Sequence, residues 1–407
     1  MNKKPKKLVV DRLNNVEKLL DRYVSEGKIP GYNCLISQHS EEVAYFQNGL
    51  KDVERSKPID RSTLFRIYSM TKPLCNVALM QLYEQGLFLL DDPVHRYIPQ
   101  WKNLKVFKSG DASDFEVCDP DRPMTIKDLC LHTAGLTYGF QQSHPVDEIY
   151  RREGISSQAQ GATLKTMADQ LADIPLQFSP GTQWNYSVAT DALGYLIEII
   201  SGQSLDVYFQ EHILTPLGMT DTSFSVPPDQ VSRFAACYLF SGSVNESGTY
   251  YDLEDDPHTS DYLEVPTLLS GGGGLVSSID DYYVFTKMLL NKGEYNGVRI
   301  LGSKTVEYMS RNHLPLDKDL AAMGQPRFSE TNYNGVGFGL GFSVIMNAAQ
   351  TGVMCSEGAI AWGGMASTCF WVDPEEDIIV IFMTQLIPSG CYPIRGQLHA
   401  AVYQALC

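Results

Sequence analysis

The sequence predicts an α/β protein in which one antiparallel sheet, flanked by helices from both chain ends, is joined to a mainly helical lobe. Three observations predict it: a helix and a strand hairpin at each end, helical periodicity between the ends, and enough apolar residues for a large core. The chain has 407 residues, of which 43% are hydrophobic and 20% charged. Such a chain buries about three quarters of its unfolded surface, which excludes disorder as a description of the whole.

The first 62 residues predict a helix followed by a hairpin. Residues 13–26 place apolar side chains on one stripe of a helix, and Gly27 ends the pattern. Residues 32–37 and 43–48 are two short strand patterns joined through a polar connection. We therefore expect one amphipathic helix and one antiparallel strand pair here.

The last 75 or so residues repeat this arrangement in reverse order. Residues 367–372 and 378–384 are β-branched or aromatic runs separated by the acidic turn 373–377, and residues 394–405 predict a closing helix. Hairpins and helices at both ends indicate a single layered unit. We predict one α/β domain from residues 1–62 and 333–407, a mainly helical domain from residues 63–332, and an active site between them.

The middle of the chain shows periodicity at helical spacing. Its clearer predicted helices are residues 70–85, 126–131, 164–171, 187–200, 204–213 and 279–290. We find no internal repeat and no linker long enough to separate independent domains.

Charge and cysteine content exclude several classes of partner. Lys and Arg total 32 against 48 Asp and Glu, a net charge of −16, which repels phosphate backbones and anionic lipids. The longest apolar run, residues 378–383, is far shorter than the ~20 residues of a membrane-spanning helix. Nine scattered cysteines without a C-x-x-C pair suit reduced thiols. We expect a cytoplasmic protein with no nucleic acid, membrane, metal or cofactor as partner.

Most standard catalytic motifs are missing from the sequence. It has no G-x-S-x-G elbow, no H-E-x-x-H helix, no Walker loop and no G-x-G-x-x-G that opens a βαβ unit. The run Gly271–Gly274 lacks a following lysine and predicts a flexible or closely packed turn. The acidic stretch Asp252–Asp261 lacks calcium-loop spacing, so we expect a solvated loop.

One candidate constellation remains, an S-x-x-K tetrad. The spacing occurs twice, at Ser25 and Lys28 where a helix ends, and at Ser69 and Lys72 where a helix begins. Three helical positions turn the chain by about 300°, which places Ser69 and Lys72 on one face within hydrogen-bond reach. A desolvated lysine has a lowered pKa and can accept the hydroxyl proton of a nucleophilic serine. The alternative is a serine N-cap followed by a surface lysine.

Several further motifs, in order along the chain, carry a resemblance to a known family. They are residues 68–73 (YSMTKP), 132–139 (HTAGLTYG), 180–187 (PGTQWNYS), 270–276 (SGGGGLV), and 362–364 (WGG) leading into 370–374 (FWVDP). Over nearly the whole chain the sequence resembles the serine β-lactamase and penicillin-binding-protein superfamily, on its class C side, and is most similar to family VIII carboxylesterases. The resemblance implies a β-lactamase/transpeptidase-like fold.

The resemblance assigns roles to individual residues. Ser69 matches the acylated serine, Lys72 its lysine, and Tyr186 the tyrosine of the Y-x-N element that serves with the lysine as general base and acid. The backbone amides of Ser69 and Met365 would form the oxyanion hole. The local sequence alone indicates only that Tyr186 lies between a Pro-Gly turn and a helix, in a loop that can present its hydroxyl.

Two departures from the β-lactamase pattern bear on the substrate. Val188 replaces the asparagine of Y-x-N, and Trp362, before Gly363 and Gly364, replaces the lysine that recruits a substrate carboxylate. Neutral esters therefore fit better than anionic β-lactams, in a pocket formed by these four residues and Trp184.

His132 is expected to have a structural role rather than a catalytic one. Because the Ser-Lys-Tyr triad requires no histidine, we expect His132 to make a structural hydrogen bond.

We predict a serine carboxylesterase that hydrolyses short-chain esters through an acyl-enzyme on Ser69. Three alternatives stay open. The chain is also similar to acyltransferases of the lovastatin-synthesis type, in which an alcohol replaces water. A β-lactamase or D-amino-acid-peptidase-like hydrolase and a non-catalytic penicillin-recognition-type binding protein are the others, although a binding protein has no need of Ser69, Lys72 and Tyr186 together.

Overall fold

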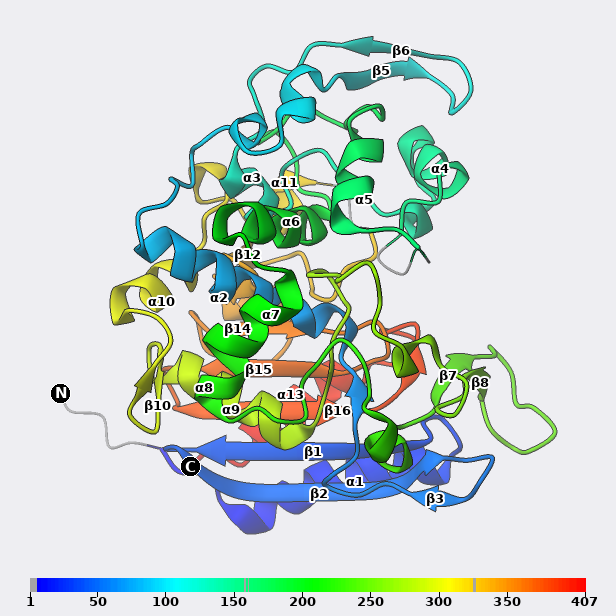
Figure 1. Cartoon of the computed structure of the whole chain (residues 1–407). Coiled ribbons are helices and arrows are strands. Elements are labelled where there is room, and N and C mark those ends of the chain that lie inside the picture. Colours follow the sequence, from blue (N-terminus) through cyan, green and yellow to red (C-terminus); the bar gives the residue numbers. More distant parts are fainter. Residues whose placement is uncertain (1–5, 157–158, 160, 325–326) are drawn as a thin grey trace.

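The computed structural model describes residues 6–156, 159, 161–324 and 327–407, and the largest element in this part of the chain is an eight-stranded antiparallel sheet (Figure 1). Its strands, in spatial order, are β12 (Val336–Phe338), β13 (Ser343–Ile345), β14 (Ile360–Gly363), β15 (Cys369–Asp373), β16 (Ile378–Met383), β1 (Gly31–Gln38), β2 (Glu41–Asp52) and β3 (Lys57–Pro58). The two predicted hairpins meet where β1 pairs with β16. The predicted α/β class and the terminal sheet are confirmed.

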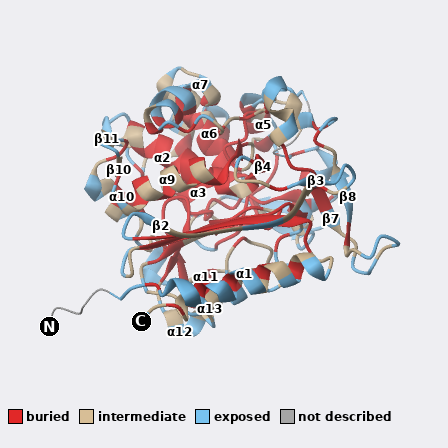
Figure 2. Ribbon diagram, turned by 90° about the horizontal axis from the view of Figure 1, so that it is seen from below, coloured by how far each residue is buried: buried red, intermediate tan, exposed pale blue. Residues whose placement is uncertain are grey.

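The two terminal helices cover one face of this sheet (Figure 2). They are α1 (Val10–Ser25) and α13 (Ile394–Tyr403). Alternate strand residues point toward them, because successive side chains of a strand face opposite sides. The resulting core contains Leu13, Val16, Leu20, Cys34, Ile36, Val380, Phe382, Leu398 and Val402, all fully buried.

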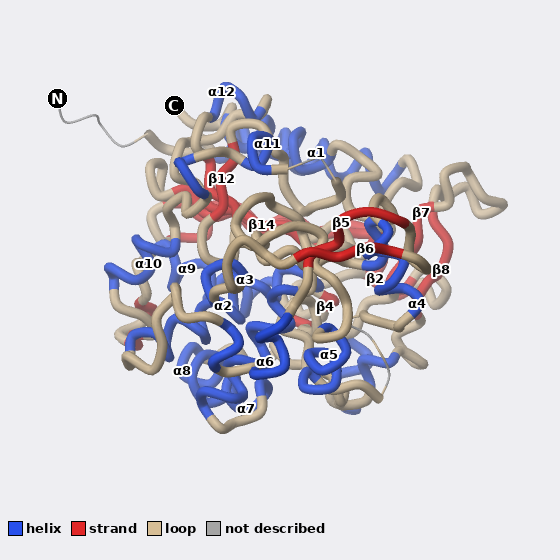
Figure 3. The backbone as a smooth tube through the Cα atoms, turned by 90° about the horizontal axis from the view of Figure 1, so that it is seen from above, coloured by secondary structure: helices blue, strands red, loops and turns tan. Residues whose placement is uncertain are grey.

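The other face of the sheet packs against the helical lobe (Figures 1 and 3). The lobe and its surroundings contain α2 (Thr71–Glu84), α3 (Ile126–Cys130), α4 (Pro145–Arg152), α5 (Leu164–Leu171), α6 (Ala189–Ser201), α7 (Leu205–Phe209), α8 (Thr215–Leu217), α9 (Ile279–Leu290), α10 (Ser303–Met309) and α11 (Leu320–Met323), while α12 (Ala348–Thr351) lies between β13 and β14. Helix α9 lies directly against β16, and α2 packs against α6.

Local sequence signals explain why two of these helices have the bounds predicted for them. Helix α5 begins after Thr163, whose hydroxyl accepts a hydrogen bond from the amide of Thr166, and α9 begins after Ser278, whose hydroxyl accepts one from Asp281. Such N-caps satisfy amide groups that the first helical turn leaves unpaired. The predicted helix 204–213 instead divides into α7 and a π-helical turn over Gln210–Leu214.

Several short strands lie in the region predicted to be mainly helical. They form three pairs: β4 (Phe65–Arg66) with β9 (Val276–Ser277), β5 (Val106–Gly110) with β6 (Phe115–Cys118), and β10 (Glu294–Tyr295) with β11 (Val298–Arg299). Two more, β7 (Cys237–Phe240) and β8 (Tyr251–Asp255), form a three-stranded sheet with β17 (Leu386–Ile387) from the C-terminal part of the chain. The proposed domain bounds at residues 62 and 333 stay a prediction.

The acidic stretch Asp252–Asp261 is exposed at residues 252–254, as expected, but the expectation of a loop is wrong for its first part, which lies in β8. The reason is the fully buried guanidinium of Arg66, whose Nε donates to the carboxylate of Asp255 over 2.7 Å. A buried cation needs a counter-charge, so this acidic segment pairs with β7 and reaches Arg66.

Among the described residues, no helix combines the length and apolar character needed to cross a membrane.

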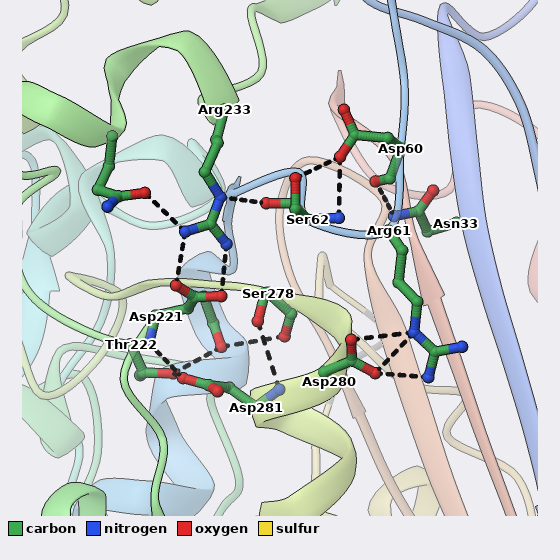
Figure 4. A network of polar contacts seen from close by, with 12 residues as sticks. Asn33, Asp60, Arg61, Ser62, Asp221, Thr222, Arg233, Ser278, Asp280 and Asp281 are labelled. Carbon is green, nitrogen blue, oxygen red and sulfur yellow. Dashed lines mark hydrogen bonds and ion pairs between the residues drawn. The ribbon is translucent and has the colours of Figure 1, made fainter.

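A polar network joins the segment that follows β3 to the start of α9 (Figure 4). Asp281 is a buried carboxylate in this network: its Oδ2 accepts hydrogen bonds from the Asp221 amide (2.7 Å) and the Thr222 hydroxyl (2.9 Å). Burial, together with the negative charges of Asp221 and Asp280, raises the pKa of Asp281 to about 6, although the hydrogen bonds oppose the shift. The neighbouring carboxylates are in turn held by arginines, Asp221 by Arg233 and Asp280 by Arg61.

The pKa of Asp281 predicts a pH-dependent effect on stability. Because its pKa rises from 3.8 to about 6 on folding, the folded protein holds its proton at pH 4.5 but buries a charge at pH 8. Asp281→Asn keeps an acceptor oxygen and removes that charge. We expect the variant to gain about 2 kcal/mol of stability relative to the wild type between pH 4.5 and pH 8, because the unfolded carboxyl is already mostly ionised at pH 4.5.

Thermal unfolding at both pH values measures this difference. Asp280→Asn is the matched control, since Asp280 is the adjacent residue but its side chain is 48% exposed. A difference between Asp281→Asn and the wild type that stays constant from pH 4.5 to pH 8 contradicts the prediction.

Candidate active site

Ser69 lies in the 3₁₀ turn Tyr68–Met70 that leads into α2, at the junction between the sheet and the helical lobe. The turn is held from behind, because the Tyr282 hydroxyl of α9 donates to the Met70 carbonyl over 2.9 Å. Tyr68 itself has a backbone φ of 41°, in the left-handed region that residues other than glycine rarely adopt. The residue before Ser69 is thus fixed in a strained conformation.

Lys72, the second residue of α2, is 1% exposed and its ammonium makes three contacts. Nζ lies 3.2 Å from Ser69 Oγ, 3.0 Å from the Tyr138 hydroxyl and 2.6 Å from the Gly272 carbonyl oxygen. The three acceptors come from three separate chain segments. The S-x-x-K spacing therefore places Lys72 within hydrogen-bond distance of Ser69. The alternative interpretation, in which Lys72 lies on the surface, is wrong, because Lys72 is buried.

Burial lowers the pKa of Lys72 to about 8, while the negative charges of Asp191 and Glu330 and the thiol of Cys75 raise it in opposition. Desolvation disfavours the ammonium, so the neutral amine is accessible near neutral pH. A neutral amine 3.2 Å from a hydroxyl can act as its general base.

Tyr186 approaches Ser69 from the loop before α6. Its hydroxyl lies 2.5 Å from Ser69 Oγ, and its ring is 2% exposed. Burial first, and then the charge of Glu330, raises the pKa of this phenol well above its ordinary value. Tyr186 therefore stays protonated and is suited to donate a proton, whereas Lys72 is suited to accept one.

Tyr138 is a member of the site that the sequence analysis did not single out. Its hydroxyl contacts Lys72 Nζ, and its ring lies edge-on to the Tyr186 ring with centroids 5.1 Å apart. Burial raises the pKa of Tyr138 well above its ordinary value, so it also stays protonated. The sequence did contain a signal for Tyr138, because this residue belongs to the 132–139 motif that carries the family resemblance.

The glycines after Trp362 allow the sheet to approach Ser69. A Cβ on Gly364 would lie 2.5 Å from the carbonyl oxygen of Ile67, two residues before the serine. Met365, next in the chain, packs against Tyr68. Among the described residues, neither the Ser69 nor the Met365 amide donates a hydrogen bond, as oxyanion-hole donors require.

The predicted pocket residues are more buried than a solvent-lined pocket would have them. Trp184, Val188 and Trp362 are 2%, 0% and 1% exposed. The indole of Trp184 stacks on the Tyr186 ring at 6.3 Å, and that of Trp362 meets the same ring edge-on at 5.5 Å. Both tryptophans orient Tyr186, and the assignment of these residues to a substrate pocket stays a prediction.

His132 has the structural role that was expected of it. Its Nδ1 lies 3.1 Å from the Ser187 hydroxyl, and its ring lies edge-on to Tyr186. Burial and the charge of Lys72 lower its pKa well below the ordinary value, so His132 is neutral.

A buried ion pair supports the glycine segment from the far side. Arg395 donates to the Glu330 carboxylate over 2.7 Å, and to the carbonyls of Gly364 and Thr368 over 3.3 and 2.9 Å. A Cβ on Gly363 would lie 2.3 Å from the Arg395 guanidinium. No sequence motif marked this pair, because its members lie 65 residues apart.

The described residues contain no group of three or more His, Cys, Asp or Glu that could hold a metal ion.

Comparisons with known proteins show which family and fold this chain is similar to. The family profile described as Beta-lactamase matches residues 16–403. Protein Rv1367c of Mycobacterium tuberculosis is 32% identical over 367 residues, which cover 89% of this chain and 87% of that protein. Esterase EstB of Burkholderia gladioli is 29% identical, with 95% and 94% covered. The structure of EstCE1, described as a hydrolase with promiscuous acyltransferase activity, is 27% identical, covers 97% and 99%, and superposes with a TM-score of 0.78.

The geometry predicts which variants lose nucleophilic reactivity. Ser69→Ala should abolish covalent labelling by a fluorophosphonate and leave the melting temperature close to that of the wild type. Lys72→Ala and Tyr186→Phe should each slow labelling by about 10² or more, as loss of a positioned proton-transfer group commonly does. Labelling of folded Ser69→Ala at the wild-type rate, followed by mass spectrometry, would place the nucleophile elsewhere.

The pKa values predict how the labelling rate depends on pH. Lys72 accepts a proton only as the neutral amine, so the rate should rise with pH through about 8 and then level off. The Tyr186 phenol stays protonated over this range. Rates from pH 6 to 10, corrected for hydrolysis of the probe, measure the profile, and a flat profile contradicts a lysine base.

Proposed function

The chain belongs to the β-lactamase family of serine hydrolases, and from this premise we propose that it is a carboxylesterase of the family VIII type that works through an acyl-enzyme on Ser69. The observation that carries the proposal is the position of the Ser69 hydroxyl, 3.2 Å from Lys72 Nζ and 2.5 Å from the Tyr186 hydroxyl. A serine between a depressed-pKa amine and a protonated phenol has both a base and an acid at hand.

Acylation follows from these positions. Ser69 Oγ attacks the ester carbonyl carbon while its proton passes to the neutral amine of Lys72. The oxyanion that forms is stabilised by the amides of Ser69 and Met365, neither of which donates a hydrogen bond within the described part of the chain. Collapse of this intermediate breaks the bond to the alcohol, whose oxygen takes the Tyr186 proton, and Lys72 returns its own proton to Tyr186.

Deacylation repeats the same steps with water as the nucleophile. Water gives one proton to Lys72 as its oxygen attacks the acyl carbon, and Ser69 Oγ leaves with a proton from Tyr186. The carboxylic acid is released and each group regains its starting protonation state. No metal or cofactor takes part in these steps.

The residues that replace the β-lactamase pattern favour neutral esters with short acyl chains. Trp362 contributes a buried indole where a lysine would recruit a carboxylate, and Val188 lacks a side-chain donor for an amide. The similarity to Esterase EstB supports an ester substrate. The nine cysteines, all free of disulfides, support a cytoplasmic location.

Acyl transfer to an alcohol is a second candidate function. It uses the same acyl-enzyme, with an alcohol in place of water. The similarity to EstCE1, described as having promiscuous acyltransferase activity, favours it. Added methanol or butanol during hydrolysis measures transfer directly as the yield of the new ester.

We predict that short-chain esters are better substrates than β-lactams. A missing charge-assisted contact costs about 1.5 to 3 kcal/mol, so a chromogenic cephalosporin should react at least about tenfold more slowly in kcat/KM than p-nitrophenyl butyrate. p-Nitrophenyl esters of two to about twelve acyl carbons define the chain-length preference, and Ser69→Ala gives the background rate. A larger kcat/KM for the cephalosporin would overturn the ester assignment.

A further inference from the structure

Asp191 is a fully buried carboxylate that the mechanism above does not use. It is the third residue of α6 and is 0% exposed. Its Oδ1 accepts hydrogen bonds from the Ser270 hydroxyl and from the Gly272 amide, the latter over 3.0 Å. Its Oδ2 is buried and has no hydrogen-bond partner among the described residues. A carboxylate removed from water in this way is costly unless a positive charge lies near.

Gly272 connects this carboxylate to the catalytic lysine. Its amide donates to Asp191, and its carbonyl oxygen accepts from Lys72 Nζ over 2.6 Å. A Cβ on Gly272 would lie 2.6 Å from Asp191 Oδ2, so the glycine allows the carboxylate to reach the backbone. The carbonyl that orients Lys72 is thus held in place by Asp191.

The turn that contains Gly272 is wedged between two helices. A Cβ on Gly271 would lie 2.8 Å from Cys75 Sγ on α2 and 2.8 Å from the Thr190 carbonyl oxygen on α6. The turn therefore has little freedom to move away from Lys72, and the distance between the lysine and the carboxylate is fixed by packing.

The charges of the two side chains act on each other. The charge of Asp191 is the largest influence that raises the pKa of Lys72 against burial, followed by Glu330 and Cys75. In return the charge of Lys72 lowers the pKa of Asp191, which burial raises. Glu330 already pairs with Arg395, whereas Asp191 has no cation in direct contact among the described residues.

We propose that Asp191 is the positioning residue of the catalytic lysine: through Gly272 it holds Lys72 at Ser69, and its charge stabilises the ammonium that forms when Lys72 takes the serine proton. The inference rests on the proposed function. It gives Asp191, acting across one glycine, a part comparable to that of a carboxylate that orients and stabilises a catalytic base.

A pH profile of ester hydrolysis separates this role from a merely structural one. Asp191→Asn keeps an acceptor for Ser270 and Gly272 but removes the charge. The apparent pKa of the rise in kcat should fall by about one unit, because the ammonium loses its counter-charge, and the plateau rate should fall about tenfold. Glu198→Gln is the matched control, a half-buried carboxylate on the same helix that accepts from the Leu205 amide, and should change neither value.

A stability cycle tests the charge coupling without any catalysis. Asp191→Asn should lower the melting temperature of the wild type, in which it leaves Lys72 unbalanced. In a protein that already carries Lys72→Met, the same substitution should raise the melting temperature or leave it unchanged, because it removes a lone buried charge. The double variant should fold even where Asp191→Asn alone does not.

The results distinguish a wrong role for Asp191 from a wrong proposed function. An unchanged apparent pKa in folded Asp191→Asn, or equal losses of melting temperature in both backgrounds, overturns the role of Asp191. A wild-type protein that hydrolyses no ester overturns the proposed function instead, and the stability cycle still reports whether Asp191 balances Lys72.

Discussion

The site depends on one constraint, the burial of the Lys72 ammonium at the junction of the sheet and the helical lobe. A buried ammonium must find an acceptor for each of its three protons. Ser69, Tyr138 and the Gly272 carbonyl supply them from three segments that lie far apart in the sequence. The helical lobe brings these segments to one point, and the terminal sheet closes the site from the other side.

Close approach of these segments depends on missing side chains. Gly271 and Gly272 allow the turn before β9 to enter between α2 and α6, and Gly364 allows β14 to meet the backbone before Ser69. A Cβ would collide with Cys75 and Thr190 at Gly271, with Asp191 at Gly272, and with Thr368 and Ile67 at Gly364. The run Gly271–Gly274, predicted to be a flexible or closely packed turn, is therefore closely packed at Gly271 and Gly272.

The sequence predicted those features that depend on local pattern. Alternation and periodicity were sufficient for the terminal strands and for α5 and α9, and the S-x-x-K spacing was sufficient to join Ser69 to Lys72, because a helix fixes that geometry. Tyr186 came from the resemblance, since a loop tyrosine has no local signature.

Features that depend on distant segments were beyond sequence patterns. Asp191 is one polar residue on a largely apolar helix, and its meaning appears only when the 270–272 turn lies against it. Likewise the sequence predicted a solvated loop where β8 lies. The buried Arg66 that pairs with Asp255 lies 189 residues away, so no local pattern indicated the strand.

The balance of charge in the site also bears on what it can bind. Lys72 faces Asp191, and Arg395 is occupied by Glu330 and by the carbonyls beneath the glycine segment. Trp362, which the resemblance matches to a lysine of the β-lactamases, adds no further cation. A substrate carboxylate would therefore enter a partly desolvated site whose positive charges are already balanced, in a protein of net charge −16. A neutral ester develops negative charge only on its carbonyl oxygen during reaction. In the proposed mechanism this charge is received by the amides of Ser69 and Met365, which donate no hydrogen bond among the described residues.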